Sequence, residues 1–180
     1  MKTVIKTNRL ILRPWRIEDA QGMFKYAKDP DVGPKAGWPP HRSIEDSELI
    51  INKFIDHHPY CFAMTLVDTL EVIGCIELKL APTDLAANDN EAEIGYWLGK
   101  PFWNNGYMSE AVKAIIEFGF NELNKDIIWC GYYEGNLRSK RVQEKCGFKF
   151  HHKSENLYLP LLKEYRTGYV NIFRKTDYIK

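Results

Sequence analysis

The chain has 180 residues, of which 44% are hydrophobic and 27% are charged, values that are ordinary for one globular domain. The formal net charge is only +1, which gives no electrostatic reason to expect a nucleic-acid partner. No apolar run approaches the length of a membrane span and the N-terminus lacks a signal-peptide core, so we expect a single cytoplasmic domain over residues 1–180.

The first third of the chain predicts a strand and two helices with a loop between them. Residues 3–13 alternate as a strand or a bent pair of strands, and the helix that follows ends at Asp29, before a proline. Residues 31–42 are rich in proline and glycine and carry Trp38, so we expect a loop there. A second helix begins at Ser43 and runs to about residue 57. The loop is either a surface connection or one wall of a substrate cleft.

The middle of the chain predicts a hairpin and then a strand with two different faces. Residues 61–67 and 72–80 are expected to form the hairpin, and residues 81–90 a polar loop. In the strand over residues 92–99, apolar and polar positions alternate. Its two faces carry Ala92, Ile94, Tyr96 and Leu98 on one side, and Glu93, Gly95 and Trp97 on the other.

A short connection joins this strand to an amphipathic helix over residues 109–123, whose apolar stripe begins with Met108. Such a turn leaves the N–H groups at the start of the helix unpaired, and together with the helix dipole they form an anion site. Gly106 would let the backbone approach a phosphate closely, because it has no Cβ. The alternative is a plain tight turn.

The last third predicts a strand over residues 127–133 and a helix that begins at Asn136 and ends at Gly147. Closing strands are expected at residues 148–152 and 169–174, joined by an irregular link near Leu157. These elements predict an α/β (α+β) fold, with a mixed sheet flanked by helices.

The cysteines and histidines do not have the spacing of a metal site. We expect reduced, buried thiols and no metal, the thiols being Cys61, Cys75, Cys130 and Cys146. The chain also lacks G-x-x-x-x-G-K-[ST] and G-x-G-x-x-G, which argues against a P-loop NTPase or a dinucleotide-binding enzyme.

Four motifs occur together and in a fixed order. Residues 7–14 read T-x-R-L-x-L-R-P, residues 73–76 read I-G-x-I, residues 93–111 read E-I-G-Y-W-L-x-x-x-x-W-x-x-G-Y-M-x-E-A, and residues 136–148 read N-x-x-S-x-R-V-x-E-K-x-G-F. This combination resembles the GNAT superfamily of acyl-CoA-dependent N-acetyltransferases, in the branch of the ribosomal-protein-alanine acetyltransferases RimJ and RimL. The resemblance covers nearly the whole chain. It implies the GNAT fold, with a mostly antiparallel sheet.

The resemblance also implies a seat for acetyl-CoA. The family's phosphate loop is usually Q/R-x-x-G-x-G/A, and here it runs from Trp103 to Met108 and departs at its first and last positions. Backbone N–H groups would bind the phosphates, the strand edge would pair with the pantetheine amides, and Asn136 would bind the cofactor or only cap its helix. The implied cofactor-binding residues are Trp97, Leu98, Gly99, Trp103, Asn104, Asn105, Gly106, Tyr107, Met108, Ser109 and Asn136.

Acetyl transfer to an amine needs a neutral amine, so a base must take a proton from it. Glu93 is the expected base, because it lies on the polar face of the central strand just before the cofactor loop. The alternative is a carboxylate that is ion-paired for structural reasons. Glu77 and Glu91 are the reserve bases.

The reaction also needs a polarised thioester carbonyl and a proton for the leaving thiolate. A backbone N–H near Leu98 is the expected oxyanion donor. Ser139 matches the serine that lies by the sulfur in RimL-like enzymes, and Tyr132 or Tyr133 is the substitute proton donor. Since no residue stands out as a nucleophile, we expect direct attack in a ternary complex.

The acceptor amine stays open at this stage. Trp38 and Glu77 are the expected substrate contacts, and a protein N-terminal amine fits the resemblance best, with polyamines, aminoglycosides and free amino acids as alternatives. A monomer or a homodimer is expected. Two other functions compete: a non-catalytic acyl-CoA-binding module and, ranked last, an RNA-stacking protein.

Overall fold

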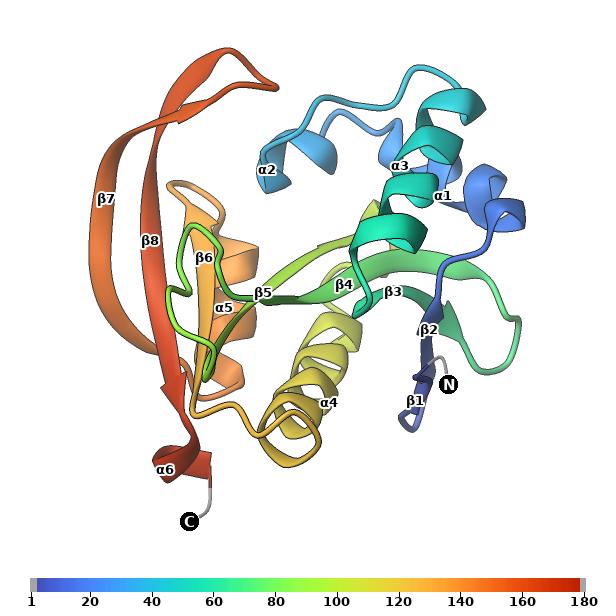
Figure 1. The fold of residues 1–180 in the computed structure, drawn as a ribbon. Helices are drawn as coiled ribbons and strands as arrows, with labels where there is room; N and C mark the ends of the chain where they lie inside the picture. The colour runs from blue at the N-terminus through green and yellow to red at the C-terminus, as the bar shows by residue number, and fades with distance from the viewer. Residues whose placement is uncertain (1–2, 179–180) are drawn as a thin grey trace.

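The computed structural model describes residues 3–178, which form one eight-stranded sheet in the order β1-β2-β3-β4-β5-β6-β8-β7 (Figure 1). Neighbouring strands are antiparallel except β5 and β6, which are parallel. The prediction of a mixed, mostly antiparallel sheet is therefore confirmed. The strands are β1 (Ile5–Lys6), β2 (Leu10–Pro14), β3 (Cys61–Leu66), β4 (Val72–Leu80), β5 (Glu91–Leu98), β6 (Ile127–Tyr133), β7 (Lys149–Leu159) and β8 (Glu164–Arg174).

Helices cover both faces of this sheet. In Figure 1, α1 and α3 lie above the β2–β5 part of the sheet and α4 lies below it. The helices are α1 (Ala20–Ala27), α2 (Gly33–Ala36), α3 (Ile44–His57), α4 (Tyr107–Asn121), α5 (Leu137–Lys145) and α6 (Lys175–Tyr178), with short 3₁₀ turns at η1 (Ile17–Asp19) and η2 (Lys100–Phe102). No helix within residues 3–178 is long and apolar enough to cross a membrane.

Two separate apolar clusters hold these layers together. The larger one joins α4 to β2–β6 and includes the fully buried Ile115 and Phe120. The smaller one lies under α1 and α3 around Trp15, Met23 and Ile51. Burying apolar surface on both faces of the sheet fixes its position between the two helix layers.

Strand β5 has the two faces that its alternation predicts. Ala92, Ile94 and Leu98 belong to the larger cluster, between the sheet and α4. Trp97 packs against the smaller cluster, between the sheet and the α1–α3 layer. The β5–β6 ladder ends at Ile94 and Cys130. Beyond this point, β5 stays paired with β4 as far as Leu98, but within the described residues its other edge has no strand partner. This open edge positions the candidate site.

Two sequence predictions need correction. The irregular link near Leu157 is wrong, because β7 continues through it to Leu159 and forms a long hairpin with β8, with a shift of register between Ser154 and Leu157. Its side chains are exposed on both faces, so the sequence carries no alternating pattern there. The loop over residues 31–42 contains one helical turn, α2. This turn has a proline among its first two residues, and Gly37 caps its C-terminal end in the left-handed conformation.

Candidate functional site

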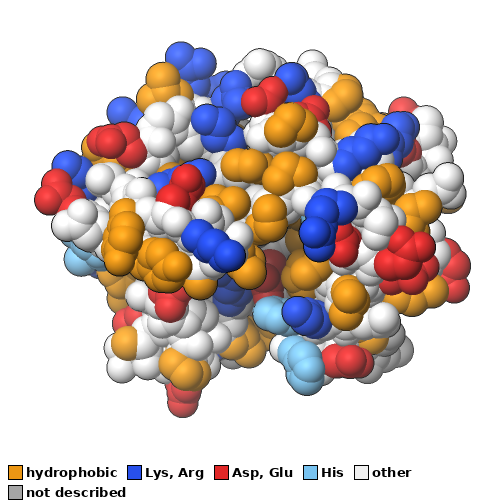
Figure 2. Space-filling view, turned by 90° about the horizontal axis from the view of Figure 1, so that it is seen from above, with side chains coloured by type: hydrophobic (Ala, Val, Ile, Leu, Met, Phe, Trp, Pro, Cys, Tyr) orange, Lys and Arg blue, Asp and Glu red, His pale blue; other side chains and the backbone are white. Residues whose placement is uncertain are grey.

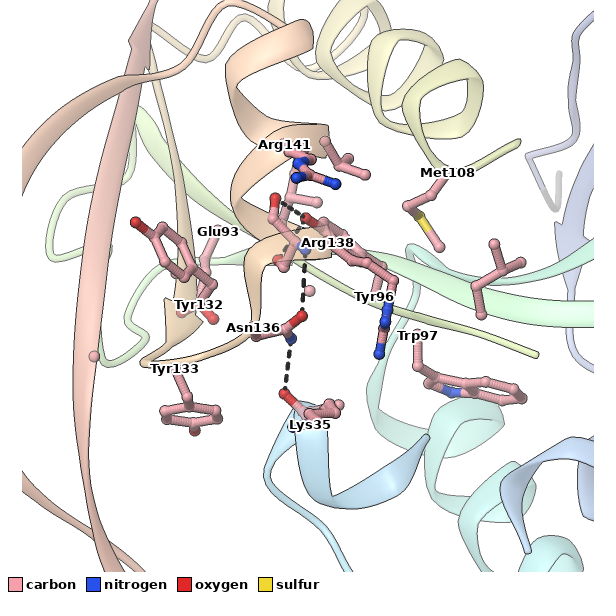
Figure 3. Close-up of a pocket in the computed structure, with 18 of the residues that line it drawn as sticks. Lys35, Glu93, Tyr96, Trp97, Met108, Tyr132, Tyr133, Asn136, Arg138 and Arg141 are labelled. Carbon is pink, nitrogen blue, oxygen red and sulfur yellow. Dashed lines mark hydrogen bonds between the residues drawn. The ribbon is translucent and has the colours of Figure 1, made fainter. Parts of the chain in front are cut away.

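A cavity of about 840 Å³ opens where β5 and β6 separate. Side chains of β5, β6, α5 and α2 surround it, together with the loop before α4 and part of the β7–β8 hairpin (Figure 3). Most of the residues that the sequence predicts for a site lie along it. These are Glu93, Trp97, Leu98, Trp103, Asn104, Gly106, Tyr107, Met108, Ser109, Asn136 and Ser139.

The start of α4 has the geometry of an anion cradle. Asn104 and Gly106 have φ values of +63° and +81°, so the loop curls through the left-handed region twice. The first helical hydrogen bond of α4 runs from Glu110 N–H to the Gly106 carbonyl. The N–H groups before it, at residues 107–109, therefore lie outside the helical ladder and are available at the positive end of a 15-residue helix. These groups fit a phosphate.

The N-terminal segment fixes this loop in place. Arg9 donates to the Asn105 carbonyl at 3.0 Å and its guanidinium lies 4.3 Å from the centre of the Tyr107 ring. Its N–H and Nε donate to the two carboxylate oxygens of Glu110, and Thr7 donates to the same carboxylate. The T-x-R segment at residues 7–9 therefore holds the loop in place, a role that sequence reasoning did not identify.

A basic stripe on α5 faces the same region. Arg138, Arg141 and Lys145 recur at three- and four-residue steps, which places them on one side of the helix, and all three line the cavity. Arg138 stacks over the Trp103 ring at 3.9 Å, and Trp103 in turn donates to the Leu98 carbonyl at 2.8 Å. Sequence reasoning missed this stripe, although its helical spacing is visible in the motif.

Glu93 lies in the cavity and forms an ion pair with Lys79 on β4, at 2.8 Å. The Glu93 side chain is 12% exposed and the Lys79 side chain 38%. Burial by itself would lower the pKa of Lys79, but the adjacent Glu93 carboxylate outweighs it and the pKa of Lys79 is raised. Seen from above, the molecule is hollowed near its centre, with side chains of both charges deep in the hollow (Figure 2).

Ser139 lies beside Tyr96, a residue that sequence reasoning did not assign to the site. Its Oγ is 2.8 Å from the Tyr96 hydroxyl and 3.1 Å from Gln143 Nε2. Burial raises the pKa of Tyr96 well above its usual value, so this phenol stays protonated. Tyr96 belongs to the site because it lines the cavity, while it also packs against the larger apolar cluster, on the α4 side of β5.

Asn136 performs the capping role that the sequence predicts. Its Oδ1 accepts from Ser139 N–H at the start of α5, at 3.3 Å. Its Nδ2 donates to the Lys35 carbonyl in α2, at 3.2 Å, so it joins α2 to α5 across the cavity mouth (Figure 3).

The two reserve proton donors also border the cavity. Tyr132 stacks on Tyr169 with ring centres 5.2 Å apart, and Tyr133 lies under Arg166, 5.4 Å from its guanidinium. Burial raises the pKa of both Tyr132 and Tyr133.

Two predicted substrate contacts, Trp38 and Glu77, are not among the described residues that line the cavity. Trp38 packs edge-on against Trp97, with ring centres 5.9 Å apart, and therefore supports a lining residue from behind. Glu77 points toward the α3 end and pairs with His58, with Glu77 Oε1 2.5 Å from His58 Nδ1.

Two predicted cofactor contacts, Gly99 and Asn105, also fall outside the described lining. Gly99 faces α1, where a Cβ would lie 2.8 Å from the Tyr26 ring. The carbonyl of Asn105 is held by Arg9. The reserve base Glu91 accepts hydrogen bonds from Ala87 N–H, Asn88 and Trp129 and anchors the preceding loop.

The four cysteines are buried and free, as predicted. Cys61 and Cys75 lie closest to one another, with 3.5 Å between the sulfur atoms. Cys146 is the thiol nearest the loop, and burial raises its pKa to about 11. None of these thiols is suited to act as a nucleophile at neutral pH. Within residues 3–178, no three His, Cys, Asp or Glu side chains gather as a metal site would require.

Comparison with known proteins gives one consistent result. The family model described as "Acetyltransferase (GNAT) domain" matches residues 9–149. The uncharacterized N-acetyltransferase p20 of Bacillus licheniformis is 31% identical over 147 residues, covering 79% of this chain and 80% of the relative. The uncharacterized N-acetyltransferase YoaA of Bacillus subtilis is 29% identical over 153 residues, covering 83% and 84%.

Solved structures share the fold. An acetyltransferase of the GNAT family from Bacillus anthracis superposes with a TM-score of 0.85 at 24% identity, covering 97% of this chain and 99% of that one. A ribosomal-protein-S5-alanine acetyltransferase from Vibrio fischeri gives a TM-score of 0.74 at 19% identity, covering 97% and 98%.

Proposed function

The chain belongs to the GNAT family of acetyltransferases and is an N-acetyltransferase, and on that premise we propose that it moves the acetyl group of acetyl-CoA to a primary amine by direct attack in a ternary complex. One observation carries this proposal: an anion cradle, a hydroxyl pair and a carboxylate border the same cavity. These are the groups needed to hold the donor, to protonate the leaving sulfur and to deprotonate the acceptor.

The described residues fit the donor. The N–H groups at 107–109 and the basic stripe of α5 would hold its phosphates, while the open edge of β5 after Ile94 would pair with its amides. The bound donor supplies the thioester. Arg138 covers Trp103, so the phosphate end of the cavity is bounded by a cation stacked on an aromatic ring.

Glu93 is the proposed base. It lies on the opposite face of β5 from Tyr96, so it can take a proton from an amine that approaches from the side of α1–α3. The Lys79 ammonium already contacts this carboxylate. A cationic acceptor would therefore compete with Lys79 for the same oxygen atoms, and it reaches Glu93 by displacing that contact.

The pair of hydroxyls at Ser139 and Tyr96 is the proposed source of the proton for the leaving thiolate. Direct transfer is supported by the buried state of the thiols, which leaves no suitable nucleophile for a covalent acetyl-enzyme among the described cysteines. The acceptor we propose is a protein N-terminal amine, because a structural neighbour is a ribosomal-protein-S5-alanine acetyltransferase.

The Lys79–Glu93 ion pair also favours a second function. If this pair is permanent, the carboxylate is occupied and the protein is an acyl-CoA-binding module without turnover. Binding and turnover therefore have to be measured separately.

A thermal shift with acetyl-CoA, against ATP and NADH as controls, tests the donor site. A ligand at a hundred times its Kd adds about 2.7 kcal/mol, which corresponds to about 5–11 °C for a domain of this size. CoA release is then followed with N-terminal peptides beginning with alanine or serine, and with spermidine as a small-molecule acceptor. Release with a peptide supports the proposal. A shift without release for any amine supports the binding module, and no shift at millimolar acetyl-CoA contradicts both functions.

A further inference from the structure

A buried polar chain runs from β8 to the cavity behind Ser139. Gln143, in the last turn of α5, is 0% exposed, and Asn171 on β8 is 5% exposed. Asn171 Nδ2 donates to Gln143 Oε1 at 2.7 Å, and Gln143 Nε2 donates to the Gly131 carbonyl and to Ser139 Oγ, both at 3.1 Å. A buried amide costs stability unless it is fully paired, and Gln143 is.

The Gly131 carbonyl determines which way the Gln143 amide points. A carbonyl oxygen can only accept, so the group 3.1 Å from it has to be the amide nitrogen. If the amide were turned over, two acceptor oxygens would face each other. The second proton of Nε2 is then directed at Ser139 Oγ, and the Tyr96 hydroxyl, at 3.5 Å, is a more distant partner.

Proton counting shows what this orientation does. The hydroxyls of Ser139 and Tyr96 carry two protons between them, and the single hydrogen bond that joins them at 2.8 Å uses one. Gln143 Nε2 also donates a hydrogen bond to Ser139 Oγ. The buried side of the hydroxyl pair therefore presents a donor and, among the described residues, no acceptor. Among the residues that the structure describes, the one other acceptor near the pair is the Ser139 carbonyl, at a long 3.4 Å from Tyr96 Oη. The second proton is therefore left for a group in the cavity, which both residues line.

We propose that Gln143, held by Asn171, is a positioning residue that directs one hydroxyl proton of the Ser139–Tyr96 pair toward the leaving sulfur. This role rests on the proposed function. As the amine nitrogen bonds to the acetyl carbon, the carbon–sulfur bond breaks and its electron pair goes to sulfur, which takes the hydroxyl proton. The amine proton passes to Glu93 and on to water, and water restores the hydroxyl proton, so protons and electrons balance.

The test compares Gln143→Met with the wild type. Methionine has a similar volume but cannot donate, so Ser139 loses the group that sets its direction. At pH 7 we expect kcat to fall at least tenfold, with the KM for acetyl-CoA changed less than twofold. The deficit should shrink at pH 9.5, because a thiol with a pKa near 8.5 leaves as the thiolate without a proton donor. Asn171→Leu should show the same dependence on pH.

A neighbouring residue provides the control. Glu144 follows Gln143 on α5 but is exposed and lies outside the cavity lining, so Glu144→Gln should leave kcat unchanged. If Gln143→Met does not fold, Asn171→Leu carries the test alone: it removes the donor that holds the Gln143 amide in place, and it should show the same loss at pH 7.

Three results would overturn the inference: an unchanged kcat at pH 7, a deficit of equal size at pH 7 and pH 9.5, or a raised KM with normal kcat. The second of these indicates a purely structural role. A wild type that acetylates no amine contradicts the proposed function and this role with it. Wild-type turnover with an unaffected Gln143→Met contradicts only the role.

Discussion

Arg9 and Glu110 lie 101 positions apart in the sequence and form two hydrogen bonds with each other. The backbone N–H of Arg9 donates to one carboxylate oxygen of Glu110 at 2.9 Å, and its Nε donates to the other at 2.7 Å. This contact joins the start of β2 to the first turn of α4. Burial by itself would raise the pKa of Glu110, but the hydrogen bonds from Thr7 and Arg9 outweigh it, and the pKa is lowered. The negative charge at the start of α4 is thereby neutralised beside the proposed phosphate cradle.

Replacing Arg9 by methionine should weaken the binding of acetyl-CoA about tenfold or more. The loop loses its hold on the Asn105 carbonyl, and the Glu110 carboxylate loses its cationic partner next to the bound phosphates. Calorimetry measures the affinity directly. Arg42→Met is the matched control, because the Arg42 side chain is 91% exposed and forms a loose ion pair with Asp46, at 3.7 Å. Equal affinities for Arg9→Met and the wild type would separate the T-x-R segment from the cofactor site.

Glu93→Gln should lower kcat about a hundredfold or more at neutral pH while the affinity for acetyl-CoA stays within twofold. Glutamine keeps the size of the side chain and can still accept from Lys79, but it cannot take the amine proton. Glu77→Gln serves as the comparison, because it removes a carboxylate from the same face of the sheet at a place outside the described cavity lining. Undiminished turnover of Glu93→Gln across the pH range would assign the residue to a structural ion pair.

Gly106→Ala should reduce the affinity for acetyl-CoA more than it reduces stability. The residue has φ +81°, a conformation that costs a residue with a Cβ roughly 1–2 kcal/mol, and it forms the turn from which the cradle N–H groups project. Gly147→Ala is the control, because its φ is +94° at the far end of α5. Both variants should show a similar drop in thermal stability. Only Gly106→Ala should lose affinity in calorimetry, and equal losses would remove this turn from the binding site.

Glu91→Gln should destabilise the protein at pH 7 by about 1–3 kcal/mol, and the difference should shrink in acid. The hydrogen bond from Asn88, followed by those from Trp129 and Ala87 N–H, lowers the pKa of Glu91 in the folded protein. A lowered folded pKa stabilises the fold above the ordinary pKa, near 4.3, and the contribution is lost as the pH falls through the folded value. Urea unfolding at pH 7 and pH 3 measures both ends. Glu48→Gln, at an exposed position of α3, should show no such dependence.

The sequence predicts those parts of the fold whose pattern is local. Alternation along β5 separates Glu93 from Tyr96 correctly, and Ser43 and Asn136 cap their helices as expected. The β7 strand has no such pattern, because nearly all of it is exposed and nothing requires its residues to alternate.

The site was predictable to the extent that single residues carry it. Ser139 is expected from its motif, but its partners Tyr96 and Gln143 come from a strand and from a buried helix position, where a sequence pattern indicates only core. Lys79 was missed for a related reason. It reaches Glu93 through the pairing of β4 with β5, and the register of two strands is a three-dimensional property.

The two ends of the cavity are built in different ways. The proposed donor end comes largely from one continuous stretch, β5 through the start of α4, together with α5. The proposed acceptor end is lined by α2, the loop after β4 and the β7–β8 hairpin, which are connecting or peripheral segments. Segments of that kind tolerate insertion and substitution without disturbing a core. Acceptor preference can therefore diversify in evolution, or be exchanged by loop grafting, while the donor half is inherited unchanged.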